Sequence, residues 1–353
     1  MRRHAIKCLT VVLATIVASL WSSGSSRAAD VISNPISLYV SDEILNTVTQ
    51  YNAITGVFQR VLITAGAGGM VGPNGIVVNR VAPPELVVAN QNLFLPINGD
   101  IRVFLEGRGG APEFTLVPAS DPNAPFAPFA ILLYGTELLI ADEAGRVEVF
   151  DATTTPATFL QNLDTTGYTK PLNPFGMVVG PDGLLYVATR SFEAGVAGDV
   201  IRFDLAKNKF VDVFVSGEGC FCNLDDLSGV VFGPDQRLYV TSSRPATPPL
   251  GDTDKILIFN GTTGVFVDRI DLDSAGATVR SAAPGLLFGP NGLLYVTIAQ
   301  LDASGNATGV GSIRKYDVAK KQFQVIVQPN TTLKLPTLLT FGSTNPATLV
   351  YGQ

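Results

Sequence analysis

A short apolar triplet with high β propensity recurs along the chain at roughly fifty-residue intervals, and this repeat constrains the fold more than any other feature. The copies begin at Leu38, Leu86, Leu138, Leu185, Leu238, Leu294 and, in weaker form, Leu349. A unit of this length holds about four short strands. Units of this kind must pack against one another, because a single unit cannot bury its own apolar face.

The unit that contains Leu185-Tyr186-Val187 shows the expected order of strands. The segment 176–179 is continuously apolar, as in a strand packed on both faces. Gly180-Pro181-Asp182-Gly183 then predicts a tight turn, because Asp-Gly supplies the positive φ angles that hairpins need. Copies of this turn begin at Gly72, Gly233 and Gly289. A third strand with two-residue alternation, as in 147–150, and an outermost strand, as in 210–215, complete the unit.

The two ends of the chain suggest how the repeat closes. The first unit starts with its second strand at Leu38, and the chain ends with an extra copy of a first strand at 338–342. Placing that C-terminal strand inside the first unit joins the ends and removes exposed strand edges. The prediction is an all-β, six-bladed β-propeller with four-stranded antiparallel blades. The segment 349–351 leaves seven blades as the alternative.

The repeat resembles a known group of propellers. Gly285-Leu286-Leu287-Phe288-Gly289-Pro290-Asn291-Gly292-Leu293-Leu294-Tyr295-Val296, followed by Ile313-x-x-Tyr316-Asp317 and Phe323-x-x-x-Val327, is similar to NHL-repeat and gluconolactonase-like proteins. The resemblance covers nearly all of residues 36–351 and implies a six-bladed ring. It leaves activity open, because that group includes calcium- or zinc-dependent lactonases, lyases and binding modules without catalysis.

The first 29 residues have the order of a secretory signal peptide: a basic start, an apolar run over 8–21, and a small polar stretch ending at Ala29. The apolar run is shorter than the ~20 residues of a membrane span. We therefore expect a secreted or periplasmic protein whose residues 30–353 form a single propeller domain without a membrane span. Cleavage leaves 20 basic and 30 acidic residues, a charge that disfavours nucleic acid as a partner.

Cleavage also removes His4, the single histidine of the chain. The mature protein then lacks the imidazole that Ser-His-Asp or Cys-His catalysis and histidine-ligated zinc require. A streptogramin-lyase-like activity, which depends on a histidine in the propellers this chain resembles, is excluded on the same ground.

A ligand site is expected where the loops that enter the innermost strands converge on the central channel. Counting seven residues back from the first glycine of each turn gives Ala65, Pro128, Asn173, Asp226, Ala282 and Leu335. Asn173 and Asp226 are thus predicted to lie on adjacent blades at the channel mouth, with Asp225 beside the latter. We treat all three as candidate ligand-binding residues, against the simpler role of hydrogen bonding to their own loops.

Asn173 and Asp226 are also the candidate metal ligands, because Ca²⁺ binds carboxylate and amide oxygens. The resemblance implies a ring of about four protein ligands for Ca²⁺ or Zn²⁺, drawn from different blades. Four of the six equivalent positions are apolar, so the ring is at best half present. Second-strand ends offer further candidates: Glu43, Asp142, Glu143 and Glu193.

Cys220 and Cys222 are the two cysteines of the mature chain, and they lie in the loop before Asp225. In an exported protein a disulfide between them is expected. Such a disulfide closes a small, strained ring that staples the loop. A redox or metal-binding pair and two free thiols remain the alternatives.

Two functions follow from these residues. The first is an exported binding or scaffold module that takes a small molecule, a glycan or a protein at the channel mouth and acts as a monomer. The second is a metal-dependent lactonase or hydrolase in which Asn173 and Asp226 hold Ca²⁺ or Zn²⁺. Long links after the second strands of blades four to six, at 190–199, 242–254 and 299–311, are expected to wall one side of the mouth.

Overall fold

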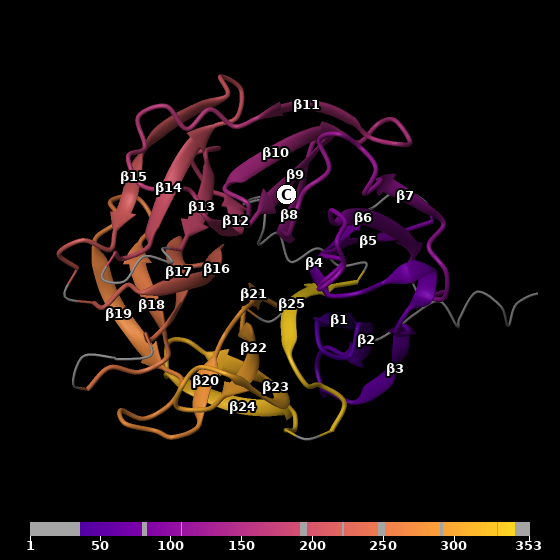
Figure 1. Cartoon of the computed structure of the whole chain (residues 1–353). Coiled ribbons are helices and arrows are strands. Elements are labelled where there is room, and N and C mark those ends of the chain that lie inside the picture. The colour runs from indigo at the N-terminus through magenta and orange to yellow at the C-terminus, as the bar shows by residue number, and fades with distance from the viewer. Residues whose placement is uncertain are drawn as a thin grey trace, which may run out of the picture.

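The structure is a computed structural model that describes residues 36–79, 83–106, 108–190, 196–220, 222–245, 251–289, 292–329 and 331–342. These residues form six sheets arranged in a ring around one axis (Figure 1). The predicted all-β, six-bladed propeller is therefore confirmed, and the seven-bladed alternative is wrong. The predicted signal peptide (1–29), Glu193 and the segment 349–351 lie outside the described residues.

Each blade is an antiparallel sheet whose strands follow one another from the channel outward. The first blade consists of β25 (Pro336–Phe341), β1 (Ser37–Asp42), β2 (Thr47–Asn52) and β3 (Phe58–Ile63). The second consists of β4 (Pro73–Asn79), β5 (Glu85–Asn90), β6 (Asp100–Leu105) and β7 (Phe114–Val117). The third consists of β8 (Pro128–Tyr134), β9 (Glu137–Asp142), β10 (Arg146–Asp151) and β11 (Thr158–Asn162).

The remaining three blades follow the same plan. The fourth consists of β12 (Pro174–Val179), β13 (Leu185–Thr189), β14 (Asp199–Asp204) and β15 (Lys209–Ser216). The fifth consists of β16 (Asp226–Phe232), β17 (Arg237–Ser243), β18 (Lys255–Asn260) and β19 (Phe266–Asp271). The sixth has an inner strand in two pieces, followed by three long strands: β20 (Arg280–Ala282), β21 (Leu286–Phe288), β22 (Leu294–Leu301), β23 (Ala307–Asp317) and β24 (Gln322–Val327).

Helix is nearly absent from the described part of the chain, where the one helical element is a 3-10 turn over Ala67–Gly69. Accordingly, none of the described residues lies in a helix of the length and apolar character that crossing a membrane requires.

The C-terminal strand closes the ring. β25 pairs with β1 in antiparallel register, with Leu38 opposite Phe341 and Val40 opposite Leu339. The first blade therefore contains strands from both ends of the described chain, as predicted. This pairing covers the inner edge of β1, which would otherwise be unpaired.

Aromatic contacts between blades explain why the triplet contains tyrosine. Tyr295, on the second strand of blade six, meets Phe341 of the closing strand edge to face, with ring centroids 5.0 Å apart. Tyr186 with Phe232 and Tyr239 with Phe288 repeat this contact between the preceding blades. Such pairs contribute about 0.5–1.5 kcal/mol each beyond the burial of their area. The repeated tyrosine thus fastens each of these blades to the next.

One predicted turn is a strand. Gly72-Pro73-Asn74-Gly75 stands at the start of β4, where Pro73 pairs with Asn90, and does not connect β4 to β5. Gly72 has a φ of 73°, and a Cβ on Gly75 would lie 2.8 Å from the carbonyl oxygen of Phe129 in the next blade. Gly72 is needed where the chain enters the strand, and Gly75 is needed where two backbones approach closely. Together these glycines give a sequence that looks like a turn. Two of the mouth positions counted from the turns are therefore wrong. The residue equivalent to Asn173 is Gly72 in blade two, where the count gave Ala65, and Ala127 in blade three, where the count gave Pro128.

Candidate binding site at the channel mouth

The inner strands share an irregularity close to the end at which they begin, and this end is the mouth of the channel. In β12 the pairing shifts between Pro174 and Met177, and in β16 between Leu227 and Val230. β4 and β8 shift at the equivalent places, and in blade six the break between β20 and β21 falls there. Bulges change the direction of a side chain. Four residues at these irregularities line the cavity described below: Phe129, Ser228, Pro284 and Thr337.

Just beyond the bulges, one apolar side chain from each blade narrows the channel. These six residues occupy equivalent register positions and line a void of only about 40 Å³: Ile76, Ile131, Met177, Val230, Leu286 and Leu339. A void of this size accommodates little more than a water molecule. The channel is therefore narrow and apolar just below the mouth.

Above this apolar floor lies a cavity of about 410 Å³. Its charged lining residues are Glu43, Arg190, Asp226, Arg244 and Arg280. Small-molecule sites commonly fall in the range of about 300–1,000 Å³ and combine apolar walls with a few convergent polar groups.

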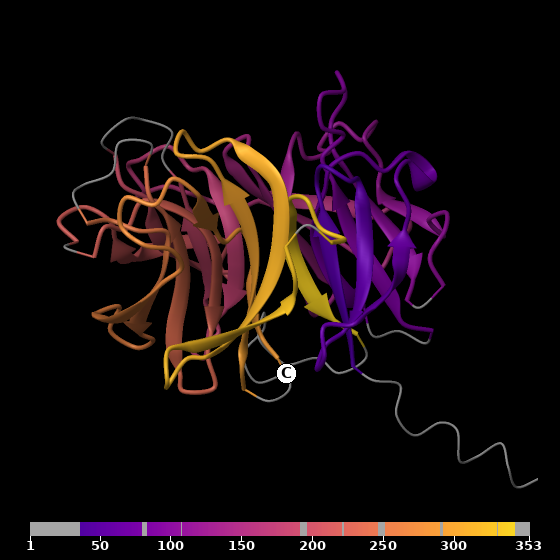
Figure 2. The same cartoon turned by 90° about the horizontal axis from the view of Figure 1, so that it is seen from below.

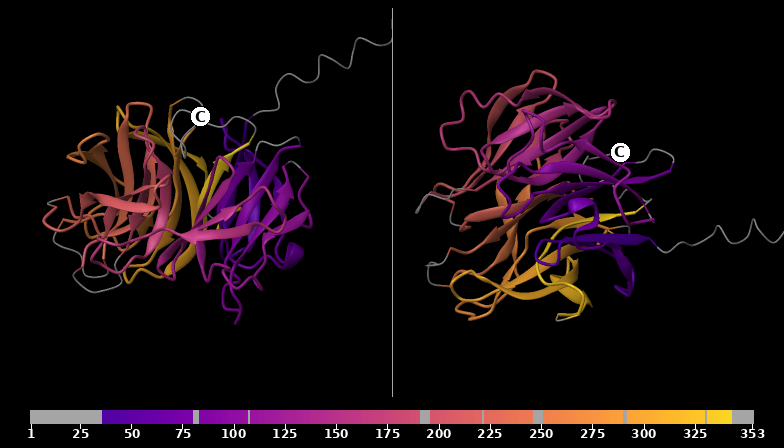
Figure 3. Two further views of the ribbon diagram at one scale, coloured as in Figure 1. Left: turned by 90° about the horizontal axis from the view of Figure 1, so that it is seen from above. Right: turned by 45° about the vertical axis from the view of Figure 1, so that its right-hand side comes forward.

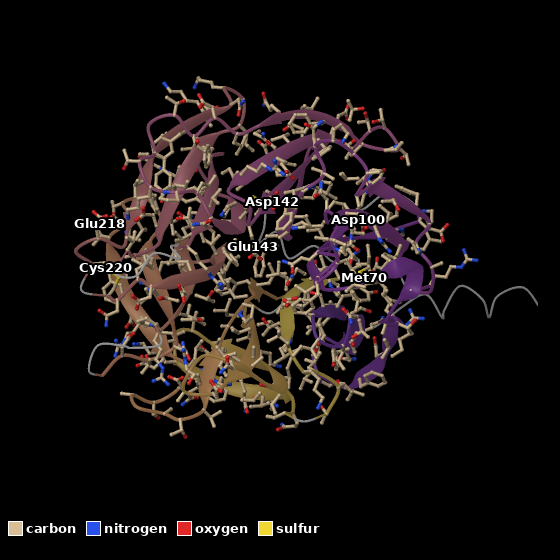
Figure 4. The ribbon with its side chains drawn as sticks, viewed as in Figure 1. Met70, Asp100, Asp142, Glu143, Glu218 and Cys220 are labelled. Atoms are coloured by element: carbon tan, nitrogen blue, oxygen red, sulfur yellow. A yellow bond between two sulfur atoms is a disulfide. The ribbon has the colours of Figure 1, made fainter. Side chains whose placement is uncertain are left out.

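The ends of the second strands supply polar side chains at the mouth in five of the six blades, and alanine in the sixth. The six equivalent positions, one for each blade in order, are Glu43, Gln91, Glu143, Arg190, Ser243 and Ala299. Gln91 Nε2 donates to Glu143 Oε1 at 3.1 Å, which links blades two and three. Figure 4 shows Glu143 close to the axis of the ring.

Three carboxyl groups at the mouth are partly stripped of water. Burial raises the pKa of Glu43, of Glu143 and of Asp226 above their ordinary values. Arg190 opposes the rise in the pKa of Glu143 and of Asp226, so its guanidinium lies within electrostatic range of both. Perturbed carboxyl groups that converge on a cavity are typical of functional sites.

The three arginines are held in place by protein acceptors. Arg190 Nε donates to the carbonyl of Leu227 at 2.8 Å, its Nη2 donates to Ser228 Oγ, and its guanidinium stacks on Phe175 at 3.8 Å. Arg280 donates through Nε and Nη2 to Asp254, at 3.2 and 2.8 Å. Arg244 donates through Nη2 to the carbonyl of Ala277 at 2.7 Å. These bonds make the arginine side of the pocket rigid.

Of the three predicted site residues, one lines the cavity. Asp226 does so, at the start of β16. Asn173 stands at the equivalent position of blade four, where its side-chain amide donates to the carbonyl of Arg190 at 3.3 Å. Asp225 turns the other way, and its Oδ2 lies 3.8 Å from Nζ of the fully buried Lys255. The adjacent aspartates therefore belong to different surroundings, because successive residues of a strand point to opposite faces.

The predicted Ca²⁺ or Zn²⁺ site stays a prediction. Asp226 lines the cavity, and Asn173 uses its Nδ2 to donate to the carbonyl of Arg190, which leaves its side-chain oxygen without a hydrogen-bond partner among the described residues. In the described part of the chain, no three His, Cys, Asp or Glu side chains gather closely enough to hold a metal ion. Asp142 is unsuited as a ligand, because its oxygens accept the backbone N–H groups of Phe126 and Ala127, each at 2.9 Å. No catalytic step through a metal is derived from this arrangement.

Cys220 and Cys222 are joined by a disulfide in the loop between β15 and β16. The backbone N–H of Gly217 donates to Asp199 Oδ1 at 3.1 Å and fixes the start of this loop. Cys220 lies on the outer side of the ring, away from Glu143 at the axis (Figure 4). The disulfide is therefore placed to restrain the loop rather than to face the cavity.

An apolar loop rises beside the mouth. The link between β5 and β6 projects from the mouth face beyond the rest of the ring (Figures 2 and 3). Phe94 at its tip is 96% exposed, and Leu95 and Ile97 are about half exposed. Asn92 holds the loop in shape, since its Nδ2 donates to the carbonyl of Asn98 and its backbone carbonyl accepts from Leu95 N at 2.8 Å.

Comparisons with known proteins identify the fold. A chain of the nidogen–laminin complex matches with a TM-score of 0.59 and 14% identity, over 88% of this chain and 99% of that one. Proteins provisionally named as 6-phosphogluconolactonases, from Bacteroides fragilis and Bacteroides uniformis, match with TM-scores of 0.53 and 13% identity. They cover 87% and 88% of this chain and 97% and 100% of theirs. The likeness is one of fold.

No protein-family model matches the chain, and no curated protein matches it. The NHL-repeat and gluconolactonase-like resemblance is thus supported as a six-bladed propeller and not as a particular family.

The sequence patterns missed the arginine half of the pocket. Arg190 follows the second strand of blade four at the position that carries Glu43 and Glu143 in other blades, so alignment of second-strand ends would have found it. Arg244 and Arg280 come from a long link and a split strand, and no repeat position marks them.

Proposed function

We propose that this protein is an exported β-propeller that binds a small organic ligand at the mouth of its channel, with the ring as a rigid scaffold. The observation that carries the proposal is the cavity of about 410 Å³, which narrows at six apolar side chains and is walled by charged ones. Charged side chains such as Glu43, Arg190 and Asp226 do not stabilise a protein core by lining open space. A ligand that pairs with these three residues would explain why they line the cavity.

Export is the part of the proposal that the first 29 residues support. N-terminal sequencing of the protein recovered outside the cytoplasm tests it. The expected result is a mature chain that starts near Asp30, and recovery of the intact N-terminus in the cytoplasm would contradict export.

Ligand binding is tested by thermal melts against a panel of amines, sugars, sugar acids and aliphatic acids. A ligand that binds the folded state raises the melting temperature by mass action. Ser304→Trp places a large ring on an exposed residue that lines the cavity and should abolish the shift. Thr262→Trp, on the exposed turn between β18 and β19, is the matched control and should retain it. Ligands whose shift survives Ser304→Trp would place binding elsewhere.

The metal-dependent lactonase or hydrolase predicted as the alternative is separated by a chelation experiment. The protein is treated exhaustively with chelator, and its melting temperature is then measured with Ca²⁺ or Zn²⁺ added. No shift with either ion is expected for the binding module. A shift that Asp226→Asn and Asn173→Ala abolish would establish the metal site instead.

A further inference from the structure

Lys255, the first residue of β18, is buried in the fifth blade and does not line the mouth cavity. Its Nζ lies 2.8 Å from Asp252 Oδ1 and 3.8 Å from Asp225 Oδ2, and it donates to the carbonyl of Thr253 at 3.1 Å. A buried ammonium group is costly unless it is paired. Here two carboxyl groups converge on one ammonium group.

The two carboxyl groups are held in place from different sides. Asp252 is fully buried, and its Oδ1 also accepts Asn223 Nδ2 at 3.3 Å. Asp225 is fixed through its backbone N–H, which donates to Ser242 Oγ at 3.0 Å. Among the described residues, the Oδ2 atoms of both aspartates are buried and accept no hydrogen bond of normal geometry. Buried oxygens without a partner are rare, so this cluster contains an interaction that its hydrogen bonds do not satisfy.

One ammonium group cannot neutralise two buried carboxylates. Burial raises the pKa of Asp225; Lys255 opposes this rise, and the Asp252 carboxyl, which lies within hydrogen-bonding reach, adds to it. A proton held between the two acids pairs both of the unsatisfied oxygens. The cluster then consists of an ammonium group, a carboxylate and a neutral carboxylic acid.

The surroundings of this cluster are apolar. Lys255 and Leu257 lie on the same face of β18, because alternate residues of a strand share a face. Leu257 packs in one apolar cluster with Leu224 and Leu227, which flank Asp225 in the chain. Moving a proton from the ammonium group to the Asp252 carboxylate removes two opposite charges from this environment and leaves an amine beside Asp225.

We propose that Lys255 and Asp225 form an intramolecular isopeptide bond, with Asp252 as the residue that moves the protons. Lys255 Nζ gives one proton to the Asp252 carboxylate, and the resulting amine attacks Cγ of the neutral Asp225 carboxyl group. The Nζ–Cγ bond forms and a Cγ–O bond breaks. The leaving oxygen carries the Asp225 proton, takes a second proton from Nζ through Asp252, and departs as water. Asp252 ends protonated, and no group is oxidised or reduced.

The bond joins the loop between β15 and β16 to β18, two strands away in the same blade. The Cys220–Cys222 disulfide lies in that loop, a few residues before Asp225. Both covalent links therefore restrain the segment that leads to Asp226, the first residue of β16 and part of the cavity wall.

Mass spectrometry of the intact exported protein, denatured and with its disulfide reduced, tests the proposal. The expected mass is that of the mature chain, with its N-terminus fixed by sequencing, less one water molecule. Trypsin should not cleave after Lys255, and the digest should contain a branched peptide that joins Lys255 to the segment around Asp225. The full mass of the sequence would overturn the proposal, and so would a water loss confined to one unbranched peptide.

Variants of the three residues identify the bond. Asp225→Ala and Lys255→Met should each have the full mass, whereas Asp225→Asn should form the same bond with loss of ammonia in place of water. Asp252→Asn should slow bond formation about a hundredfold or more, and an unchanged rate would contradict the part assigned to Asp252.

Lys321→Met is the matched control, since Lys321 Nζ lies 2.6 Å from Asp268 in an exposed ion pair. This variant should keep the water loss. The parent protein decides the proposal by its own mass, so a variant that fails to fold does not leave it open.

Discussion

Asp42 at the end of β1 accepts the backbone N–H of Leu335, 293 residues later in the chain, at 3.1 Å. The same carboxylate accepts Lys334 N at 2.6 Å and Leu45 N at 2.9 Å. Asp142 in blade three binds the loop that enters its own inner strand in the same way. In blade one the same hydrogen bonding by an aspartate joins the two ends of the ring.

Asp42→Ala should therefore lower the free energy of unfolding by about 2–4 kcal/mol, because three backbone donors lose a buried charged acceptor. Asp302→Ala is the control, since Asp302 accepts Ser304 N and Asn306 N in an exposed hairpin turn and should cost at most about 1 kcal/mol. Urea unfolding measures both. Equal losses would show that Asp42 has no special part in closure.

Glu148 on β10 should make stability depend on pH. Burial and the nearby Asp142 carboxylate raise its pKa from 4.5 to about 8, and Arg146, whose Nε lies 2.7 Å from Glu148 Oε1, opposes this only in part. Between these values the folded state holds a proton that the unfolded state has lost. The free energy of unfolding should therefore fall as pH rises through this window.

Glu148→Gln removes the carboxyl group whose protonation differs between the folded and the unfolded state. Urea unfolding at several pH values should show a shallower fall for this variant than for the parent, while the exposed Glu113→Gln keeps the parent slope. Parallel curves for the parent and Glu148→Gln would contradict a raised pKa at this residue.

Gly176 and Gly229 both lie where neighbouring inner strands touch, but replacing them with alanine should lower the free energy of unfolding by different amounts. A Cβ on Gly176 would overlap the carbonyl oxygen of Ser228 and lie 2.9 Å from Val230 N, both backbone atoms of the next blade. A Cβ on Gly229 would meet chiefly the end of the Leu286 side chain, with the nearest backbone atom at 3.3 Å.

Gly176→Ala is therefore expected to cost about 1–3 kcal/mol, and Gly229→Ala less than about 1 kcal/mol, because a side chain can move where backbone cannot. Chemical denaturation of the two variants checks the order. A larger loss for Gly229→Ala would show that Leu286 is the less adaptable neighbour.

Phe94 is a bulky residue with a φ of 64° at the exposed tip of the β5–β6 link. That conformation costs a residue with a Cβ about 1–2 kcal/mol, and glycine adopts it freely. Phe94→Gly should raise the free energy of unfolding by about 0.5–1 kcal/mol despite the greater freedom of the unfolded glycine chain. Leu95→Gly, at a neighbouring residue without positive φ, should lower it by a similar amount. Thermal melts of both variants distinguish the two signs.

The architecture was predictable because its signals are local. The Leu-Tyr-Val triplet, the Gly-Pro-Asp-Gly turn and the two-residue alternation each depend on neighbouring residues, and they recur from blade to blade with modest changes. Gly72-Pro73-Asn74-Gly75 misled for the same reason, since a strand entry beside another backbone needs the same residues as a turn.

The site was predictable only in part. Asp226 was found because it precedes a repeated strand, but its neighbour Asp225 pairs with Lys255 on another face. Arg190 of blade four and Arg280 of blade six meet Asp226 of blade five at the mouth only because three blades converge on one axis. No spacing in the chain expresses that convergence.

The sequence by itself determined the four-stranded blade and the way the C-terminal strand completes the first, because hydrogen-bonded neighbours in a sheet follow from short-range pattern and turn chemistry. Only the tertiary structure decided that there are six blades, that apolar side chains narrow the channel below its mouth, and that carboxylates and arginines share that mouth. Those properties depend on the register of six bulged inner strands around a common axis, where residues far apart in the chain come into contact.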